Sequence, residues 1–241
     1  GLGPTLRLAQ LTQSFAKAEQ SLADARKLAE LPTEPDTGTA LNTYSGALEL
    51  RDTGFAYPEA PAPLFESLSL NLAPGSVLVV RGRNGAGKTT LLRMLSGLIE
   101  PSRGQVLGDG VDLRQMAPGW WRRQIAYLPQ EPTFLNASVA DNLLAANPDI
   151  GEDGVNHVIR EAGLGAFIDE SAQGLDTPIT DNGGTLALGI RRRLALARAL
   201  ANTLGDGGRL VLFDEPTEGL DKEGAAAVYA ALKRLAEERR T

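Results

Sequence analysis

The nine residues GRNGAGKTT, Gly82 to Thr90, constrain the fold of this chain more than any other stretch of its sequence. The run Val77–Val80 leads into them and is rich in β-branched residues, which favour strands. Thr90–Leu98 follows with the residue pattern of a helix. A strand, a glycine loop and a helix in that order are typical of a phosphate-binding loop. The sequence therefore predicts an α/β fold around this loop.

The residue types in the loop suit a nucleotide triphosphate. Its glycines allow the backbone to turn with N–H groups directed at phosphate oxygens, and the helix that follows adds its positive N-terminal end. Lys88 supplies a mobile charge for the β- and γ-phosphates, and Thr89 a hydroxyl for Mg²⁺. The plainer alternative, a glycine turn that merely precedes a helix, does not require so many matching positions. The predicted nucleotide contacts in the loop are Asn84, Gly85, Ala86, Gly87, Lys88, Thr89 and Thr90.

A pair of acidic residues supports this interpretation. Leu210–Phe213 reads as a buried strand that ends in Asp214 and Glu215. Beside a phosphate loop, the first carboxylate can hold a water ligand of Mg²⁺, and the second can orient an attacking water and accept its proton. Alone, such a pair is often only a solvated turn. Together with the loop it indicates an ATPase with Glu215 and Lys88 as catalytic residues.

With these residues in place, the chain resembles the nucleotide-binding domain of an ATP-binding cassette (ABC) protein over residues 46–241. The resemblance implies a P-loop NTPase core with ATP and Mg²⁺ as ligands. A mostly parallel sheet would carry the phosphate loop, beside an antiparallel β subdomain near Leu48–Leu72 and a helical subdomain over residues 137–186.

The resemblance also implies roles for single residues. Tyr57 matches the aromatic that stacks on adenine; a strand aromatic in a small core is the alternative. Gln130 matches the glutamine that reaches Mg²⁺ and couples the site to a transport subunit, and it completes the predicted catalytic set. The predicted metal ligands are then Thr89, Gln130 and Asp214.

The five residues LALGI, Leu186 to Ile190, depart from the family's signature Leu-Ser-Gly-Gly-Gln. The register is fixed because RRRLALARAL, which follows, fits the family's next helix without a gap. Ala187 replaces the serine that donates to the γ-phosphate of the opposing nucleotide, Leu188 replaces a glycine, and Ile190 replaces the glutamine. An apolar loop that only packs before a basic helix is the alternative. We expect a weakened signature that leaves nucleotide binding in place.

Family cassettes form head-to-tail dimers, so the resemblance implies a second nucleotide-binding domain as partner. A partner with an intact signature is favoured over a second copy of this chain, because it would restore one competent site. Asp221 matches the aspartate of a loop that crosses the dimer interface. In that loop Glu218 and Gly219 stand where Ser-Ala is usual.

Three features resemble exporters in particular. They are FLNASVADNL (Phe134 to Leu143), QGLDTPITDNGGTL (Gln173 to Leu186) and an apolar stripe at helical spacing over residues 5–31. That helix either packs on its own domain or has its partner elsewhere; in exporters it continues from the last transmembrane helix. Residues 1–36 are therefore expected to be helix and linker following a transmembrane domain, which places the cassette on the cytoplasmic face of a membrane. Type I secretion and peptide exporters look nearest.

The end of the chain carries a further expectation. Ala225–Arg240 reads as the helix before the family's switch-histidine strand, and the chain stops at Thr241. Without that strand, one side of the phosphate-loop strand would be unpaired and hydrolysis by the isolated chain slow. His157 matches no family motif and is expected to be a surface or packing residue.

Composition excludes several classes of function. The chain has no cysteine, which excludes disulfides and thiol chemistry, and its net charge of −6 offers no general basic surface for nucleic acid. We therefore expect an ATPase motor of an exporter. The alternatives are a nucleotide-binding half of a heterodimer that hydrolyses weakly or not at all, and a soluble cassette of the DNA-repair or translation type, which the exporter-like segments disfavour.

Overall fold

The computed structural model describes residues 37–241. The chain divides into two units, Gly1–Asp36 and Thr37–Thr241, and the account below concerns the second. The helix predicted over residues 5–31 lies outside the described residues.

Four strands form an antiparallel sheet in the order β2-β1-β3-β4. They are β1 (Leu48–Phe55), β2 (Phe65–Leu72), β3 (Arg103–Gly108) and β4 (Val111–Asp112). Alternation of apolar and polar residues explains the sheet, because Leu48 and Leu50 both point into the core from one face of β1. The antiparallel β subdomain predicted near Leu48–Leu72 is present, and β3 and β4 extend it.

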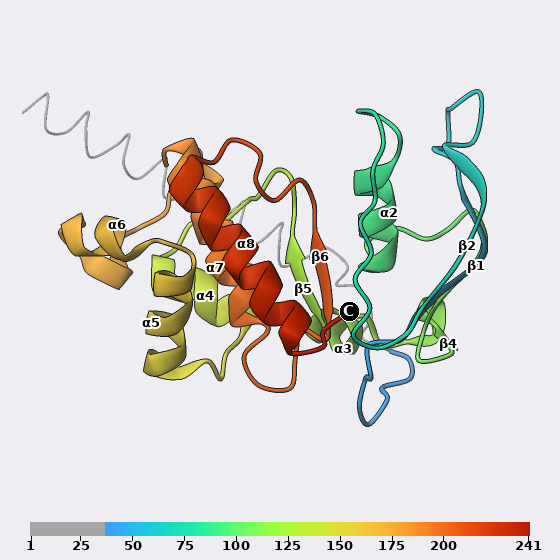
Figure 1. Cartoon of the computed structure of the whole chain (residues 1–241), viewed down its shortest axis with the longest axis horizontal. Helices are drawn as coiled ribbons and strands as arrows, with labels where there is room; N and C mark the ends of the chain where they lie inside the picture. Colours follow the sequence, from blue (N-terminus) through green and yellow to red (C-terminus); the bar gives the residue numbers. More distant parts are fainter. Residues whose placement is uncertain (1–36) are drawn as a thin grey trace, which may run out of the picture. The chain divides into compact units, whose positions relative to one another are not determined.

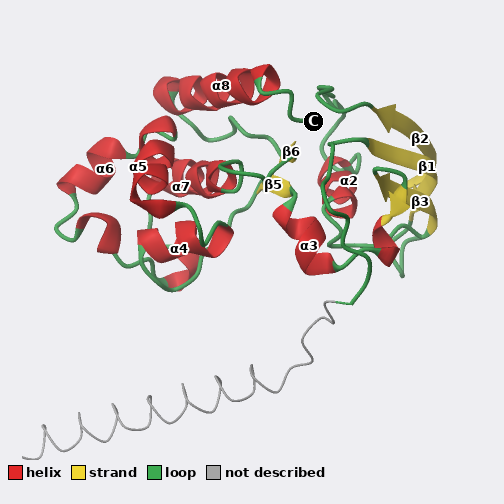
Figure 2. Cartoon of the chain, turned by 90° about the horizontal axis from the view of Figure 1, so that it is seen from below, coloured by secondary structure: helices red, strands yellow, loops and turns green. Residues whose placement is uncertain are grey.

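A second, parallel sheet pairs β5 (Ile125–Leu128) with β6 (Leu210–Phe213). The strand predicted over Leu210–Phe213 is thus confirmed. Leu210 and Leu212 are buried against the antiparallel sheet and α2 (Lys88–Leu95), while the alternate residues of β6 pack toward the helices. Figures 1 and 2 both show α2 between the β5–β6 pair and the antiparallel sheet.

The strand predicted over Val77–Val80 is absent, so that prediction is wrong for this structure. The segment runs without regular secondary structure into the glycine loop, and its side chains are largely exposed. The expected mostly parallel sheet is wrong for the same reason, since only β5 and β6 are parallel among the described strands. A strand needs a neighbour to satisfy its backbone groups, and residues 37–241 provide none beside Val77–Val80.

Helices fill the remainder of the described chain. They are α3 (Pro118–Arg123), α4 (Val139–Ala146), α5 (Gly151–Glu161), α6 (Gly165–Glu170), α7 (Leu188–Ala201) and α8 (Lys222–Glu237). Residues 137–186 hold α4, α5 and α6, and these pack with α7 and α8 around one apolar cluster. The antiparallel sheet, α2 and α3 surround a second cluster. Within residues 37–241, no helix is long and apolar enough to cross a bilayer.

Candidate nucleotide site

The glycine loop has the backbone geometry that its sequence predicts. Gly85 and Gly87 have φ angles of +80° and +91°, in the left-handed region that other residues rarely adopt. A Cβ at Gly87 would also lie 2.8 Å from Cδ2 of Leu64. The backbone conformation therefore favours glycine at this position, and any larger residue would also displace the side chain of Leu64.

The turn leaves donors free at the start of α2, which begins at Lys88. Across residues 37–241, no hydrogen bond uses the backbone N–H of Gly85, Gly87 or Thr89. Unused N–H groups at a helix N-terminus favour an anion, because the helix dipole places positive charge there. The loop can thus receive phosphate oxygens.

The side chain of Lys88 lies across the loop. Its ammonium donates to the carbonyl oxygens of Gly82 and Arg83 at 2.9 and 3.2 Å. It also lies 3.6 Å from Oε1 of Glu215. Lys88 and Glu215, predicted to act on the same phosphate, are therefore adjacent although 127 positions separate them (215 − 88).

Gln130 joins the same cluster. Because β5 and β6 are parallel neighbours, the residues that follow them, Gln130 and Glu215, meet at one edge of the sheet. Gln130 Nε2 donates to Glu215 Oε2 at 3.3 Å. Glu215 thus contacts both other residues of the predicted catalytic set, Lys88 and Gln130.

Glu215 itself has an unusual backbone. Its φ angle is +46°, the left-handed region, and Pro216 follows it, which further restricts its conformation. Such a conformation in a non-glycine residue costs about 1–3 kcal/mol and recurs at functional sites, where surrounding contacts maintain it. The surrounding contacts of Glu215 hold its carboxylate toward Lys88 and Gln130.

Asp214 is suited to hold a cation. It is only 3% exposed, and its Oδ2 atom is buried with no hydrogen-bond partner among the described residues. A buried, unsatisfied carboxylate oxygen is costly unless a ligand reaches it. Within residues 37–241, no three His, Cys, Asp or Glu residues gather into a metal site of their own. The arrangement therefore fits Mg²⁺, which commonly takes one or two protein ligands together with water and phosphate oxygens.

Tyr57 lies beside the loop, just after β1. Tyr57 is 47% exposed, and its ring meets that of Phe55 edge to face, with the ring centroids 4.9 Å apart. Its hydroxyl is 2.8 Å from Oγ1 of Thr90, on α2. The ring thus combines an accessible surface, as adenine stacking requires, with partial packing, which was the alternative.

Two of the departures from the family pattern, Leu188 and Gly219, contact each other, and a third, Glu218, contacts Gln130 and Arg192. Leu188 is the first residue of α7, after Ala187, which offers no side-chain cap. Its Cδ2 atom lies 3.0 Å from where a Cβ at Gly219 would stand. Glu218 Oε2 accepts from Gln130 Nε2 at 3.2 Å and from Arg192 at 3.4 Å.

Glu218 and Arg192 are polar contacts of the site that the sequence pattern did not assign. The signal available for Glu218 was its departure from Ser-Ala-Leu-Asp. Arg192 carried no such signal, because it is one of three consecutive arginines (Arg191 to Arg193) and the sequence does not show which of them faces the site. Asp221 caps α8 through the N–H of Gly224 and pairs with Arg193 at 2.8 Å. The hydrogen bond from the N–H of Gly224 has the larger effect and the contact with Arg193 the smaller, and both hold the pKa of Asp221 below its ordinary value.

His157 contacts a residue outside this site. It lies on α5, about half exposed, 3.5 Å from Glu161. This matches the expected surface position.

Comparisons with known proteins agree with the geometry. A family model described as "ABC transporter" matches residues 65–218. The alpha-hemolysin translocation ATP-binding protein HlyB of Proteus vulgaris is 34% identical over 240 residues, which cover 99% of this chain and 33% of that protein. The toxin RTX-I translocation ATP-binding protein of Actinobacillus pleuropneumoniae is 36% identical over 224 residues, covering 92% and 31%.

A solved structure shares the fold. The structure of a bacterial Atm1-family ABC exporter with ATP bound gives a TM-score of 0.77 at 24% identity, over 97% of this chain and 40% of that one. This chain spans about a third of the length of the curated relatives. The family model covers most of the described chain, including the phosphate loop and the acidic pair, and the chain therefore belongs to the ABC transporter family as a nucleotide-binding domain.

Proposed function

We propose that this chain binds ATP with Mg²⁺ and hydrolyses it, as the motor domain of an exporter. The observation that carries the proposal is the convergence of Lys88, Gln130 and Glu215 on a glycine loop with unused N–H groups. Binding alone needs the loop and Lys88. A carboxylate held at the γ-phosphate end adds the capacity to activate water.

Each side chain has a task that follows from its position. The loop N–H groups and Lys88 bind the phosphates, and Tyr57 offers its ring face to the adenine. Glu215 orients a water and accepts its proton, while Gln130 fixes the carboxylate through the 3.3 Å hydrogen bond. Thr89, Gln130 and Asp214 would hold Mg²⁺, which neutralises charge on the phosphate oxygens when it is bound.

The partners follow from the family and the relatives. The relatives are named as translocation ATP-binding proteins, and the chain matches about a third of their length. We propose a transmembrane domain of the same transporter and a second nucleotide-binding domain as partners, with the cassette on the cytoplasmic face. No nucleic-acid partner is proposed, given the net charge of −6. The domain assignment is residues 1–36 as a connecting helix and linker and 46–241 as the cassette.

One observation favours a second candidate function, a weakly hydrolysing half of a heterodimer. The signature position carries Leu188, whose side chain is exposed where the family has glycine. Such a chain would offer a complete nucleotide loop and a poor surface to the opposing nucleotide. We propose slow turnover by the chain alone, and faster turnover when a cassette with an intact signature is added.

The test is a Glu215→Gln chain, which keeps the shape and hydrogen-bonding reach of the side chain but removes the base. We expect phosphate release to fall by about 10²–10⁴-fold, with Mg-ATP binding by calorimetry retained. Glu170→Gln on α6, an exposed change of the same chemistry, is the matched control and should leave both unchanged. Unchanged turnover in Glu215→Gln would show that another group activates the water, and absence of Mg-ATP binding by the parent chain would overturn the whole proposal.

A further inference from the structure

Glu218, in the loop that follows β6, brings a second carboxylate to the amide of Gln130. Its Oε2 atom accepts from Nε2 of Gln130 at 3.2 Å, and Oε2 of Glu215 accepts from the same nitrogen at 3.3 Å. A side-chain amide nitrogen carries two hydrogens, so it can donate to both carboxylates at once. The donor end of Gln130 is therefore fully used within the chain.

The carbonyl end of the same amide is left for a ligand. The amide group is planar, so its oxygen Oε1 points away from the acceptors of Nε2. Across residues 37–241, no hydrogen bond reaches this oxygen. Donation to two anions also draws negative charge onto Oε1, because linked hydrogen bonds polarise one another. The oxygen of Gln130 is thus suited to Mg²⁺, which takes oxygen ligands.

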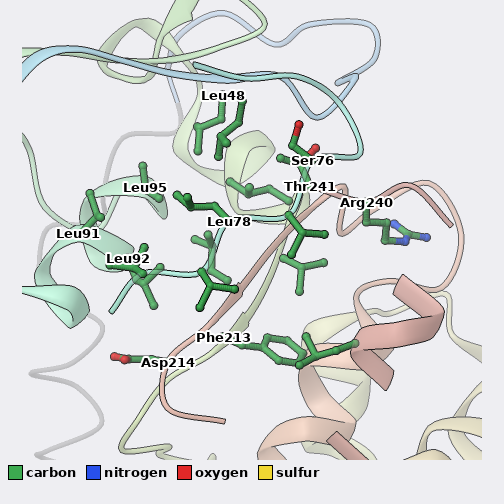
Figure 3. Close-up of a pocket in the computed structure, with 18 of the residues that line it drawn as sticks. Leu48, Ser76, Leu78, Leu91, Leu92, Leu95, Phe213, Asp214, Arg240 and Thr241 are labelled. Carbon is green, nitrogen blue, oxygen red and sulfur yellow. The ribbon is translucent and has the colours of Figure 1, made fainter. Parts of the chain in front are cut away.

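Asp214 supplies a second oxygen of this kind at the end of the neighbouring strand, β6. Its N–H donates to the carbonyl of Leu128 at 2.9 Å, which joins the ends of β5 and β6. Figure 3 shows Phe213 and Asp214 pointing to opposite sides of the chain, with the carboxylate of Asp214 on the side of α2. Its Oδ2 atom is buried without a hydrogen-bond partner among the described residues. The residues that follow these paired strands thus present oxygens that the described chain does not pair.

Arg192 and the turn after β6 hold Glu218 in place. Nη2 of Arg192, on α7, lies 3.4 Å from Oε2 of Glu218. The Arg192 side chain is only 11% exposed, so packing fixes the position of its guanidinium. At the backbone, the N–H of Glu218 donates to the carbonyl of Glu215 at 3.1 Å, which closes a turn. Because both ends of Glu218 are held, its carboxylate can fix the amide of Gln130.

We propose that Glu218 is a positioning residue, which orients Gln130 so that its Oε1 atom binds the Mg²⁺ of a bound nucleotide. The inference rests on the proposed function, which assigns Gln130 to the metal. Groups that orient a metal ligand through a hydrogen bond typically change metal affinity by about 10–100-fold when they are removed. Serine is usual at this position in the family, and its shorter side chain does not span the distance that Glu218 bridges. Glu218 therefore gives this chain a support for Gln130 that the usual residue lacks.

The experiment measures binding of the β,γ-imido analogue of ATP to the full chain by calorimetry, once in EDTA and once in Mg²⁺. The ratio of the two dissociation constants is the magnesium effect. By linkage it equals the factor by which the nucleotide raises the affinity of the chain for the metal. We expect Glu218→Ala to lower the magnesium effect about tenfold. Glu218→Gln, which keeps an acceptor oxygen but lacks the charge, should lower it only about threefold.

Two further variants separate positioning from a general effect of charge. Glu223→Ala is the matched control, because Glu223 is also exposed and also lies near an arginine, 3.7 Å from Arg193, and it should keep the magnesium effect of the parent. Gln130→Ala should lower the effect at least as much as Glu218→Ala does. The double variant Gln130→Ala with Glu218→Ala should lose no more than Gln130→Ala alone, because Glu218 acts through Gln130.

Several outcomes would overturn the inference. An additional loss in the double variant, or an equal loss in Glu218→Gln and Glu218→Ala, would mean that Glu218 acts on the metal through its charge alone. A magnesium effect that grows in Glu218→Ala would mean that Glu218 restrains Gln130 from the metal. A parent chain with a clear magnesium effect that Glu218→Ala retains would overturn this inference and leave the proposed function standing. Absence of analogue binding by the parent chain would overturn both.

Discussion

At the scale of single residues, two departures from the family pattern, Leu188 and Gly219, contact each other. A Cβ atom placed at Gly219 would lie 3.0 Å from Cδ2 of Leu188. Both residues differ from those that are usual in the family. Arg192 and Gln130 both reach Glu218, a third departure. The signature segment and the loop after Glu215 are therefore in direct contact through Leu188 and Gly219.

This contact predicts that Gly219→Ala destabilises the chain through two effects. Its φ angle of +69° is strained for alanine, at about 1–2 kcal/mol, and the new methyl group would press on Leu188. Gly205→Ala is the matched control, because Gly205 has a φ angle of +83° and nothing within 4 Å of its Cβ position. Urea unfolding should show a larger loss of unfolding free energy for Gly219→Ala, by about 0.5–1 kcal/mol.

A second substitution isolates the contact. Adding Leu188→Ala should remove the excess cost of Gly219→Ala, since the methyl group would then have room. An excess that persists in the double variant would mean that Leu188 is not the cause.

At the scale of elements, α4 has a capping box at its start, whereas α5 and α6 have no side-chain cap. Ser138 caps α4 by accepting from the N–H of Asp141, whose carboxylate accepts in turn from the N–H of Ser138. Ser138 also meets Pro178 in an isolated bridge, which ties the start of α4 to the stretch before the signature. Ser138 thus caps α4 and also joins it to the segment around Pro178.

Ser138→Ala should therefore lower the unfolding free energy by about 1 kcal/mol at neutral pH, and Ser138→Thr by much less. The hydrogen bonds of Ser138 hold the pKa of Asp141 below its ordinary value. A depressed carboxyl pKa contributes stability above its unfolded value and loses it as pH falls through the folded value. The difference between parent and Ser138→Ala, measured by urea unfolding, should consequently shrink in acid. A difference that stays constant down to pH 2 would exclude the carboxylate from the cap.

The elements also show what sequence could predict and what it could not. β6 was predictable because its apolar residues end in an acidic pair, and both signals lie within six residues. The same local signals favoured a strand at Val77–Val80, yet a strand forms only with a neighbour, and that neighbour is not a local property. β3 was missed because its sequence, RGQVLG, contains two glycines, which strands disfavour, and β4 because it has only two residues. In the site, Gln130 and Glu215 were predicted to act together, while the contacts of Glu218 and Arg192 required the folded chain.

At the scale of the whole described unit, the site lies where two cores meet. α2 packs in the core under the antiparallel sheet, whereas α7 and α8 belong to the other core. Glu215 lies between β6 and α8 and contacts Lys88 at the start of α2. Any change in the packing of one core against the other would therefore move Glu215 relative to the phosphate loop, which links nucleotide binding to the arrangement of the whole unit.

The signature segment determines whether two copies of this unit can associate in the presence of ATP. In a chain carrying Glu215→Gln to block hydrolysis, changing Ala187→Ser, Leu188→Gly and Ile190→Gln together should produce ATP-dependent self-association. Each of two equivalent sites would gain a hydrogen bond to a charged phosphate, worth about 1.5–3 kcal/mol, so the dimer should tighten at least tenfold. Sedimentation velocity with and without Mg-ATP measures the effect. The Glu215→Gln chain with its own LALGI should stay monomeric. Adding Lys88→Ala to the chain with the three signature substitutions should abolish association, because that chain would no longer bind the nucleotide. If the unrestored chain dimerises equally well with ATP, Leu188 does not impair the opposing site, and the preference for a partner with an intact signature fails.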